Sequence, residues 1–255
     1  FDIKLHGPAR DLHSGVFGGT VPNPATLLVK TLAQLLDSTH RVTIPTFYDD
    51  VLDTTPQELN QWDNLTFSDE AWAHAAGVTQ LHGEAGFTTL QRRWARPSCD
   101  VNGIYGGYMA EGAKTVIPSF AGAKVSFRLA ANQDPEKINA AFTAWLHDHT
   151  PPGCTWEISH LGSAHPVAVD TNSPYMAAAR RAMKAGTNTD PVLVRDGGTI
   201  PVIATFKNTL NLDTLLMGFG RNDDNLHSPN EKFNLDSFDK GARSHAALLH
   251  ELAQM

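Results

Sequence analysis

Apolar and polar residues alternate in four segments of the first part of the chain, and this period of two is typical of half-buried β-strands. The segments lie near residues 1–7, 100–107, 114–130 and 154–162. In the third segment the apolar residues Val125, Phe127 and Leu129 face one way and the polar residues Lys124, Ser126 and Arg128 the other. The pattern predicts a sheet with one covered face and one polar face.

Two helices are predicted between these strands, because apolar residues there recur every three or four positions. The first begins at Asn23, a good N-cap, followed by Pro24 at the first helical position. The second begins at Asp134 and stops before Pro151. The side chains expected to face inward are Leu28, Leu32, Leu35, Leu36, Ile138, Phe142, Trp145 and Leu146. This order of elements predicts a split βαβ fold, a ferredoxin-like antiparallel sheet with both helices on one face.

We assign this first domain to residues 1–163. Within it, residues from about 41 to 97 lose the periodic pattern and are interpreted as an insertion. Residues 164–255 alternate helices with short apolar segments and predict part of an α/β layer domain. The expected elements there are a helix from Ser173 to Gly186, strands at 191–194 and 213–220, and a final helix with an apolar stripe of Leu235, Phe238, Ala242, Leu249 and Leu252.

Composition narrows the class of protein. The 255 residues carry a formal net charge of -7, which argues against a nucleic-acid or anionic-lipid surface. They contain no apolar run of the roughly 18–20 residues that a membrane span needs. Small solutes or other proteins are the expected partners, and a cytoplasmic location is the default. Two cysteines are too few for a disulfide scaffold or a thiolate metal site, so Cys99 and Cys154 are expected to be interior thiols.

One histidine lies where a ligand is expected in an open α/β sheet. His227 follows the predicted strand 213–220 and precedes Pro229, which suits a helix start, and ligands usually bind at the carboxyl ends of such strands. Glu231 would then share a helical face with His227. A metal site needs at least two more donors, so a hydrogen-bonded loop histidine is the simpler interpretation of His227 alone.

Other positions could contact a substrate, although each also has a structural interpretation. His13 lies in a glycine-rich loop, where a solvated or capping histidine is the commoner case. Arg128 would suit a substrate carboxylate only if the polar side of its strand faces a cleft. The turn that contains Gly198 and Thr199 precedes a predicted helix and could present N–H groups to an anion, or could simply reverse the chain.

Five motifs taken in order are far more specific than any one of them. They are "DLHSGVFGG", "GAKTVIP", "KVSFRLAANQDPEKI", "RDGGTIPV" and "HSPNE". Together they resemble the co-catalytic metallopeptidases of the aminoacylase, succinyl-diaminopimelate desuccinylase and carnosinase clan, and most of all the carnosinase-like dipeptidases. The resemblance covers nearly the whole chain, with the insertion poorly matched.

The resemblance implies a lid domain at residues 1–163 that forms the dimer, and the C-terminal part of a three-layer α/β/α catalytic domain at 164–255. His227 would be the metal ligand that the family takes from downstream of the lid. The other metal ligands and the general base would lie upstream of Phe1, so we expect that sequence precedes Phe1 and that these residues are inactive by themselves.

The same resemblance implies roles for the substrate-contacting residues. His13 would cross to the partner subunit's site and stabilise the tetrahedral oxyanion. Thr115 and Arg128 would grip the terminal carboxylate of the substrate. Gly198 and Thr199 would contact the substrate from the Gly-Gly turn.

The implied protein is a homodimeric dipeptidase or carboxypeptidase with two divalent ions per subunit, zinc by default and manganese as the second choice. Carnosinases tend to have Ser where Thr199 stands and His where Asn102 stands, so a general dipeptidase or a carboxypeptidase fits as well as a carnosinase. Two alternatives stay open: an N-acyl amino acid amidohydrolase, and a non-catalytic dimerisation or ligand-binding module in which His227 is only structural.

Overall fold

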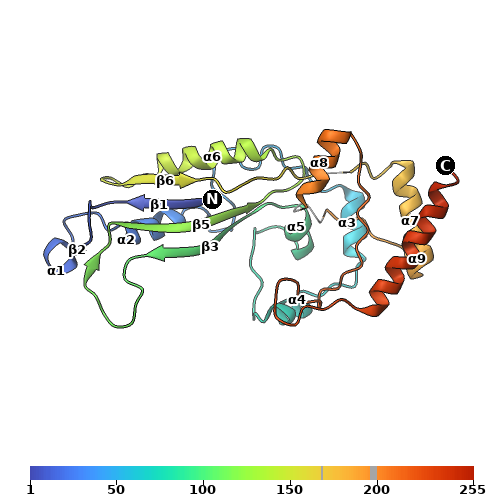
Figure 1. Ribbon diagram of the computed structural model, residues 1–255, viewed down its shortest axis with the longest axis horizontal. Helices are drawn as coiled ribbons and strands as arrows, with labels where there is room; N and C mark the ends of the chain where they lie inside the picture. The colour runs from blue at the N-terminus through green and yellow to red at the C-terminus, as the bar shows by residue number, and fades with distance from the viewer. Residues whose placement is uncertain (168, 196–199) are drawn as a thin grey trace. The chain divides into compact units, whose positions relative to one another are not determined.

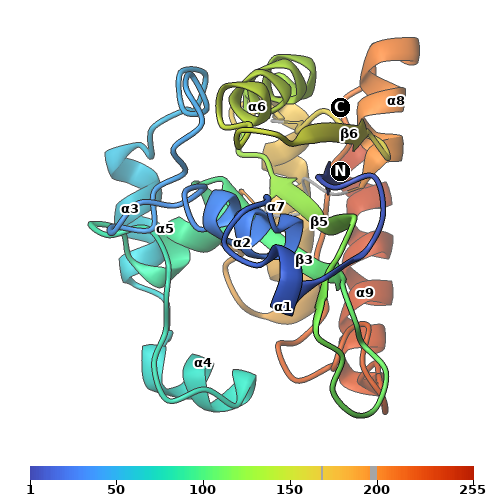
Figure 2. The same ribbon diagram turned by 90° about the vertical axis from the view of Figure 1, so that its left-hand side faces the viewer.

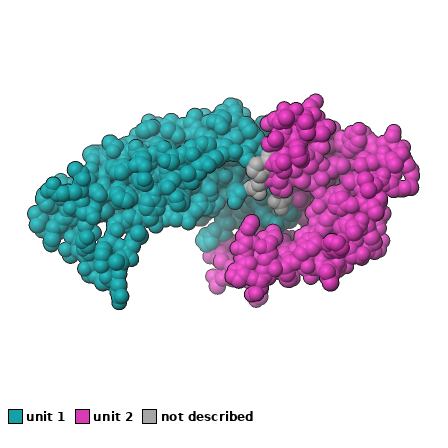
Figure 3. Space-filling view, in the orientation of Figure 1, with its two compact units in different colours: residues 1–53, 82–166 teal, residues 54–81, 167–255 magenta. Residues whose placement is uncertain are grey.

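The computed structural model describes residues 1–167, 169–195 and 200–255, which form two compact units (Figures 1 and 3). The first unit contains residues 1–53 and 82–166, and the second contains residues 54–81 and 167–255. The chain therefore passes between the units three times. The central part of the predicted insertion belongs to the second unit, while the limits of the two domains stay a prediction.

A four-stranded antiparallel sheet in the order β3-β5-β1-β6 forms the framework of the first unit. Its strands are β1 (Asp2–His6), β3 (Ser98–Gly106), β5 (Phe120–Arg128) and β6 (Thr155–Ser159), and its long helices are α2 (Pro24–Leu32) and α6 (Pro135–Asp148). This chain order and strand order are those of the split βαβ fold, so the predicted mixed α/β architecture is confirmed. The N-caps are the predicted Asn23 and Asp134.

Helices α2 and α6 cover the same face of the sheet, because their apolar residues and those of the central strands form one cluster. Members at most 1% exposed are Ile3, Leu5, Leu28, Leu35, Val125, Phe142 and Leu146. Burial of each such side chain stabilises the fold by roughly 1.5–3 kcal/mol. Leu36 departs from the prediction at 36% exposed, because α2 ends at Leu32 and the chain then turns to form a bridge between Leu36 and Val42.

The predicted insertion contains three short helices, α3 (Pro56–Asp63), α4 (Asp69–Ala76) and α5 (Thr89–Trp94). The second half of the insertion is bonded to the rest of the first unit through Glu84, which is 7% exposed. Arg96 donates to both carboxylate oxygens of Glu84, and Arg41 donates to one of them, each at 2.7 Å. A buried carboxylate is stable in this setting because charged donors replace its water.

Helix α3 holds a segment of the second unit just before the predicted Gly-Gly turn. Arg195 donates from Nε and Nη2 to the two carboxylate oxygens of Glu58 at 2.7 and 2.8 Å. Trp62, which is 2% exposed, donates from Nε1 to the carbonyl oxygen of Leu193 at 3.0 Å. Residues 54–81, whose path the sequence did not predict, therefore fix residues 193–195.

Glu58→Gln is expected to lower the free energy of unfolding at neutral pH by about 1 kcal/mol, a modest loss because the ion pair is partly exposed. Burial of the Glu58 carboxyl opposes its ionisation, but hydrogen bonds from Arg195 and Thr55 outweigh that effect and lower its pKa. A lowered folded-state pKa gives stabilisation that is present above the unfolded pKa and lost as the pH falls through the folded one.

Urea unfolding of wild type and Glu58→Gln at about pH 7 and about pH 3 measures this loss, and the difference should shrink at the lower pH. Glu70→Gln is the matched control, because Glu70 also lies in the first turn of its helix but bonds the Ser68 hydroxyl. Equal destabilisation by the two variants would contradict a specific role for the Glu58–Arg195 pair.

The second unit also contains α7 (Pro174–Thr187), α8 (Pro201–Leu210) and α9 (Leu235–Leu252). Helices α7 and α9 pack through small residues: a Cβ on Gly186 would lie 2.1 Å from the Ser244 hydroxyl oxygen. Gly186 is therefore a contact residue rather than the predicted helix end, and Asn188 caps α7 in the left-handed conformation. None of the helices in the described residues combines the length and apolar character needed to span a bilayer.

The apolar stripe of α9 is exposed in the described residues, with Leu235, Phe238 and Leu249 at 85%, 65% and 71% exposed, because the small residues of α9 pack closely against α7. The prediction of two strands in this unit is wrong. The apolar segments 191–194 and 213–220 form no strand in the described residues. An apolar run supplies only one requirement of a strand, since the strand also needs a neighbour with which to pair.

Candidate functional site

Two predicted site residues meet beside the sheet of the first unit. Strand β2 (Leu12–His13) pairs with β4 (Val116–Ile117), which places His13 opposite Val116. The Ser14 N–H donates to the Thr115 carbonyl oxygen at 3.0 Å, and the Thr115 hydroxyl oxygen lies 3.4 Å from His13 Nε2. Both side chains are exposed. Residues from two separate motifs therefore form one accessible pair.

The imidazole of His13 is oriented by the backbone that follows it. Its Nδ1 accepts from the Gly15 N–H at 3.0 Å and caps the short helix α1 (Ser14–Phe17). Because an amide N–H can only donate, the neutral ring carries its proton on Nε2. A Cβ on Gly15 would lie 2.8 Å from His13 Cε1, so a larger residue would displace the ring. His13 therefore has the capping role that its loop position suggested. Because Nδ1 makes the cap, the Nε2–H remains as an exposed hydrogen-bond donor.

Arg128 lies at the opposite end of β5 from this pair. Figure 1 shows β2 and α1 at the end of the sheet where β5 begins, and Arg128 is the last residue of that strand. At about 3.3 Å per residue, the eight steps from Phe120 to Arg128 span roughly 25 Å. A dipeptide is only about 7 Å long. Within one copy of the first unit, Arg128 and Thr115 therefore cannot grip the same dipeptide.

The guanidinium of Arg128 is exposed on the polar face of the sheet, opposite Ser98 in the register. Within the described part of the chain it has no recorded ion pair or side-chain hydrogen bond. The cation on the same face four residues earlier differs, because Lys124 Nζ bonds Asp2 at 2.8 Å. Arg128 is accordingly available to an incoming carboxylate.

His227 lies in a loop of the second unit rather than at a helix start. No helix forms at Pro229, and α9 begins only at Leu235. Glu231 consequently does not share a helical face with His227, which corrects the prediction. His227 is exposed and adopts a left-handed backbone conformation with φ of 60°. That conformation is incompatible with the predicted helical turn.

The donors described here do not by themselves make a metal site. Among residues 1–167, 169–195 and 200–255, no group of three or more His, Cys, Asp and Glu side chains could hold an ion. Catalytic zinc takes about three protein ligands, and His227 supplies one imidazole. Gly198 and Thr199 lie outside the described residues, so their substrate contacts stay a prediction.

The two thiols are poor candidates for a nucleophile. Burial raises the pKa of Cys99 to about 12, with Asp100 adding to the effect, and burial also raises the pKa of Cys154. A thiol is nucleophilic only as the thiolate, so neither side chain is activated at neutral pH.

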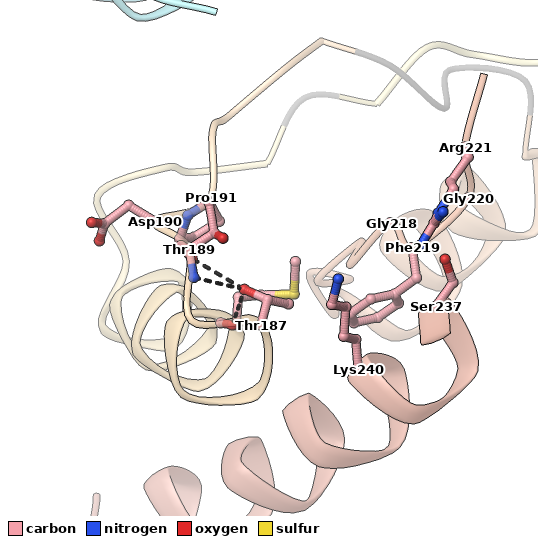
Figure 4. A pocket seen from close by; sticks show the side chains of 11 residues that line it. Thr187, Thr189, Asp190, Pro191, Gly218, Phe219, Gly220, Arg221, Ser237 and Lys240 are labelled. Carbon is pink, nitrogen blue, oxygen red and sulfur yellow. Dashed lines mark hydrogen bonds between the residues drawn. The ribbon is translucent and has the colours of Figure 1, made fainter. Parts of the chain in front are cut away.

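A small cavity of the second unit lies between the end of α7 and the start of α9 (Figure 4). Its volume is about 290 Å³, and Thr187, Phe219 and Lys240 are among its lining residues. Among the described site residues, His13, Thr115, Arg128 and His227 do not line it.

Comparison with known proteins decides the family. The model of the M20 peptidase dimerisation domain matches residues 2–154. The chain belongs to this family. The matched region contains His13, Thr115 and Arg128, and the sheet and helices that carry them are those of an M20 dimerisation domain.

The relatives of this M20 chain are metallopeptidases. The Cys-Gly metallodipeptidase of Schizosaccharomyces pombe is 34% identical over 266 residues, which cover 100% of this chain and 54% of that protein. Human carnosine dipeptidase 1 superposes with a TM-score of 0.80 at 30% identity, covering 100% of this chain and 55% of that one. The M20 family metallo-carboxypeptidase of Sulfolobus solfataricus gives 0.80 at 27% identity, covering 97% and 57%.

These matches confirm the predicted resemblance to carnosinase-like metallopeptidases. The chain spans about half the length of the curated relatives it matches. The human structure is named a dipeptidase and the Sulfolobus solfataricus structure a carboxypeptidase. These are the two activities that the sequence left open.

Proposed function

We propose that these residues serve in a homodimeric metallopeptidase that hydrolyses dipeptides or short peptides, with two divalent ions per subunit, zinc first and manganese second. They would supply the dimerisation lid and part of the active site, and would be inactive alone. The residues involved are His13, Thr115, Arg128, Gly198, Thr199 and His227. Family membership and the metallopeptidase relatives support the proposal.

The observation that carries the dimeric site is the separation of the His13–Thr115 pair from Arg128 along one sheet. Two copies remove the difficulty, because the pair of one copy can approach the substrate that Arg128 of the other copy binds. Symmetric dimers are the commonest oligomers and would build two such sites.

In this scheme each side chain has a distinct task. The Nε2–H of His13 donates to the carbonyl oxygen as it becomes a tetrahedral oxyanion. Thr115, whose hydroxyl oxygen lies 3.4 Å from His13 Nε2, would grip the terminal carboxylate together with Arg128 of the other copy. The planar fork of Arg128 binds the terminal carboxylate in two parallel hydrogen bonds and so sets which peptide bond is presented. His227 contributes its neutral imidazole as one metal ligand.

Strand β3 supports a lid-to-lid dimer. It is an edge strand that pairs only with β5 in the described residues. Val101 and Ile104 lie opposite Val125 and Ala123, so they point to the helix-covered face, yet they are 42% and 56% exposed. The register shifts at Asn102, which marks a bulge in this edge. An exposed edge with apolar flanks is a natural pairing surface.

Metal content and hydrolysis test the proposed function. The intact protein that contains these residues should bind about two divalent ions per subunit, cleave free-carboxylate dipeptides, lose activity with a chelator and regain it with zinc or manganese. The 255-residue chain should be inactive. A metal-free, inactive dimer would favour the binding module, and preference for N-acyl amino acids would favour the amidohydrolase.

A further inference from the structure

A buried carboxylate closes the base of the loop that carries His227. Asp224 is 2% exposed. Its Oδ2 accepts from the Arg221 N–H at 2.7 Å and its Oδ1 accepts from Asn234 Nδ2 at 3.0 Å. Its backbone carbonyl accepts from the Lys232 N–H at 3.0 Å. One residue thereby bonds both the beginning and the end of the loop, residues 221–234.

The side chain of Asn234 bonds Asp224 instead of capping helix α9. Asn234 is the N-cap of α9, where an asparagine side chain normally accepts from the amide two or three residues on. In this helix the side chain makes no capping hydrogen bond, and its amide donates to Asp224 instead. A side-chain cap stabilises a helix, so the bond to the buried carboxylate must offset the loss of that cap.

The backbone between these anchors is held in unusual conformations. Asn225, His227 and Asn230 all have left-handed φ angles, of 55°, 60° and 61°. This conformation is uncommon for residues other than glycine, although asparagine adopts it more readily than most, and at His227 it persists because the surroundings fix it. The Ser228 N–H also donates to the Asn225 carbonyl oxygen at 3.0 Å. The exposed imidazole of His227 is thus presented by a tightly built loop.

We propose that Asp224, together with Asn234, is a positioning residue that fixes His227 in the orientation in which its imidazole binds a divalent ion. The inference rests on the proposed function, in which His227 is a metal ligand. Asp224 is assigned a positioning role rather than a ligand role because it is 2% exposed and both of its carboxylate oxygens bond the loop. Outer residues that orient a ligand are typically worth about 10- to 100-fold in metal affinity.

A pair of compensating substitutions tests the contact itself. Asn234→Asp places two carboxylates against each other and removes the donor to Asp224 Oδ1. In the double variant Asp224→Asn with Asn234→Asp, the new amide can donate to position 234 while its oxygen still accepts from the Arg221 N–H. The double variant therefore restores the hydrogen bonds that the single variant breaks.

Zinc binding by metal-free intact protein, measured by calorimetry, is the primary readout, with circular dichroism to show that each variant is folded. Asn234→Asp is expected to weaken zinc affinity by about 10-fold or more, and the double variant to recover most of that loss. Exchange of the Lys232 amide hydrogen should accelerate in the single variant and slow again in the double variant. Asp223→Asn is the matched control, because Asp223 bonds Lys232 Nζ at 2.6 Å in an exposed ion pair, whereas the Asp224 side chain is 2% exposed.

The outcomes separate this inference from the proposed function. Wild-type zinc affinity in folded Asn234→Asp, or no recovery in the double variant, would overturn the positioning role while leaving the metalloenzyme intact. A wild-type protein that binds no zinc or manganese would overturn both. Asp223→Asn removes a negative charge and Asn234→Asp adds one, so equal losses in the two variants would show that the loop is sensitive to any substitution and would also overturn the positioning role.

Discussion

His13→Ala in the intact enzyme is expected to lower kcat by about 100- to 1,000-fold with little change in KM, because the Nε2–H acts on charge that develops only in the transition state. Removal of one oxyanion donor typically costs about 3–4 kcal/mol. Steady-state hydrolysis of a dipeptide measures the effect. His147→Ala is a suitable control, since His147 is an exposed histidine of the same unit on α6, away from the His13–Thr115 pair.

Subunit mixing shows whether His13 acts across the dimer. Each His13→Ala subunit keeps its own His227, the proposed metal ligand. Each His227→Ala subunit keeps a His13 that can enter the site of its partner. Both homodimers should be nearly inactive, whereas each heterodimer should contain one intact site. Random mixing of equal amounts makes about half of the dimers mixed and should restore about a quarter of wild-type activity. Absence of recovery in verified heterodimers would place His13 in its own subunit's site or outside catalysis.

The fold of the first unit was predictable because its signals are local. Alternation around Val125 sets the two faces of β5, and Asn23 and Asp134 mark helix starts by hydrogen bonds within a few residues. The order of elements then leaves few topologies, and the split βαβ arrangement is one of them. Nothing beyond short-range patterns was needed to place the sheet and both helices.

In the second unit, short-range sequence patterns were not sufficient to predict the packing. The stripe of Leu235, Phe238 and Leu249 indicates a helix correctly but not which face contacts α7, because the small residues that pack there have no apolar signal. A proline after His227 is equally common in a turn and at a helix start, so it could not distinguish them. The burial of Asp224 was missed because an aspartate in a polar loop gives no sequence signal for the donors that surround it.

The candidate site was only partly predictable for a similar reason. His13 and Thr115 are 102 positions apart in the sequence, and only the pairing of β2 with β4 brings them within 3.4 Å. The sequence resemblance grouped Thr115 with Arg128 as one carboxylate grip, whereas β5 separates them by most of its length. In the proposed function that separation is the reason for a second copy, and no motif spacing could have revealed it.

Arg128 should decide whether the substrate carries a free carboxylate. Arg128→Ala is expected to lower kcat/KM for unmodified dipeptides by about 10- to 100-fold, because a charge-assisted contact worth about 1.5–3 kcal/mol is lost. The same dipeptides with an amidated carboxyl terminus should be hydrolysed slowly by wild type and almost equally by the variant. Kinetics of matched free and amidated dipeptides measure the ratio.

Two further variants separate recognition of the carboxylate from a general loss of positive charge. Arg128→Lys keeps the charge but not the planar fork, so it should recover only part of the activity on free dipeptides. Lys124→Ala removes a cation from the same face of β5 that is already engaged with Asp2, and it should leave the ratio of free to amidated substrates unchanged. If Arg128→Ala slowed both substrates alike, the guanidinium would serve the fold or the dimer rather than recognition of the substrate carboxylate.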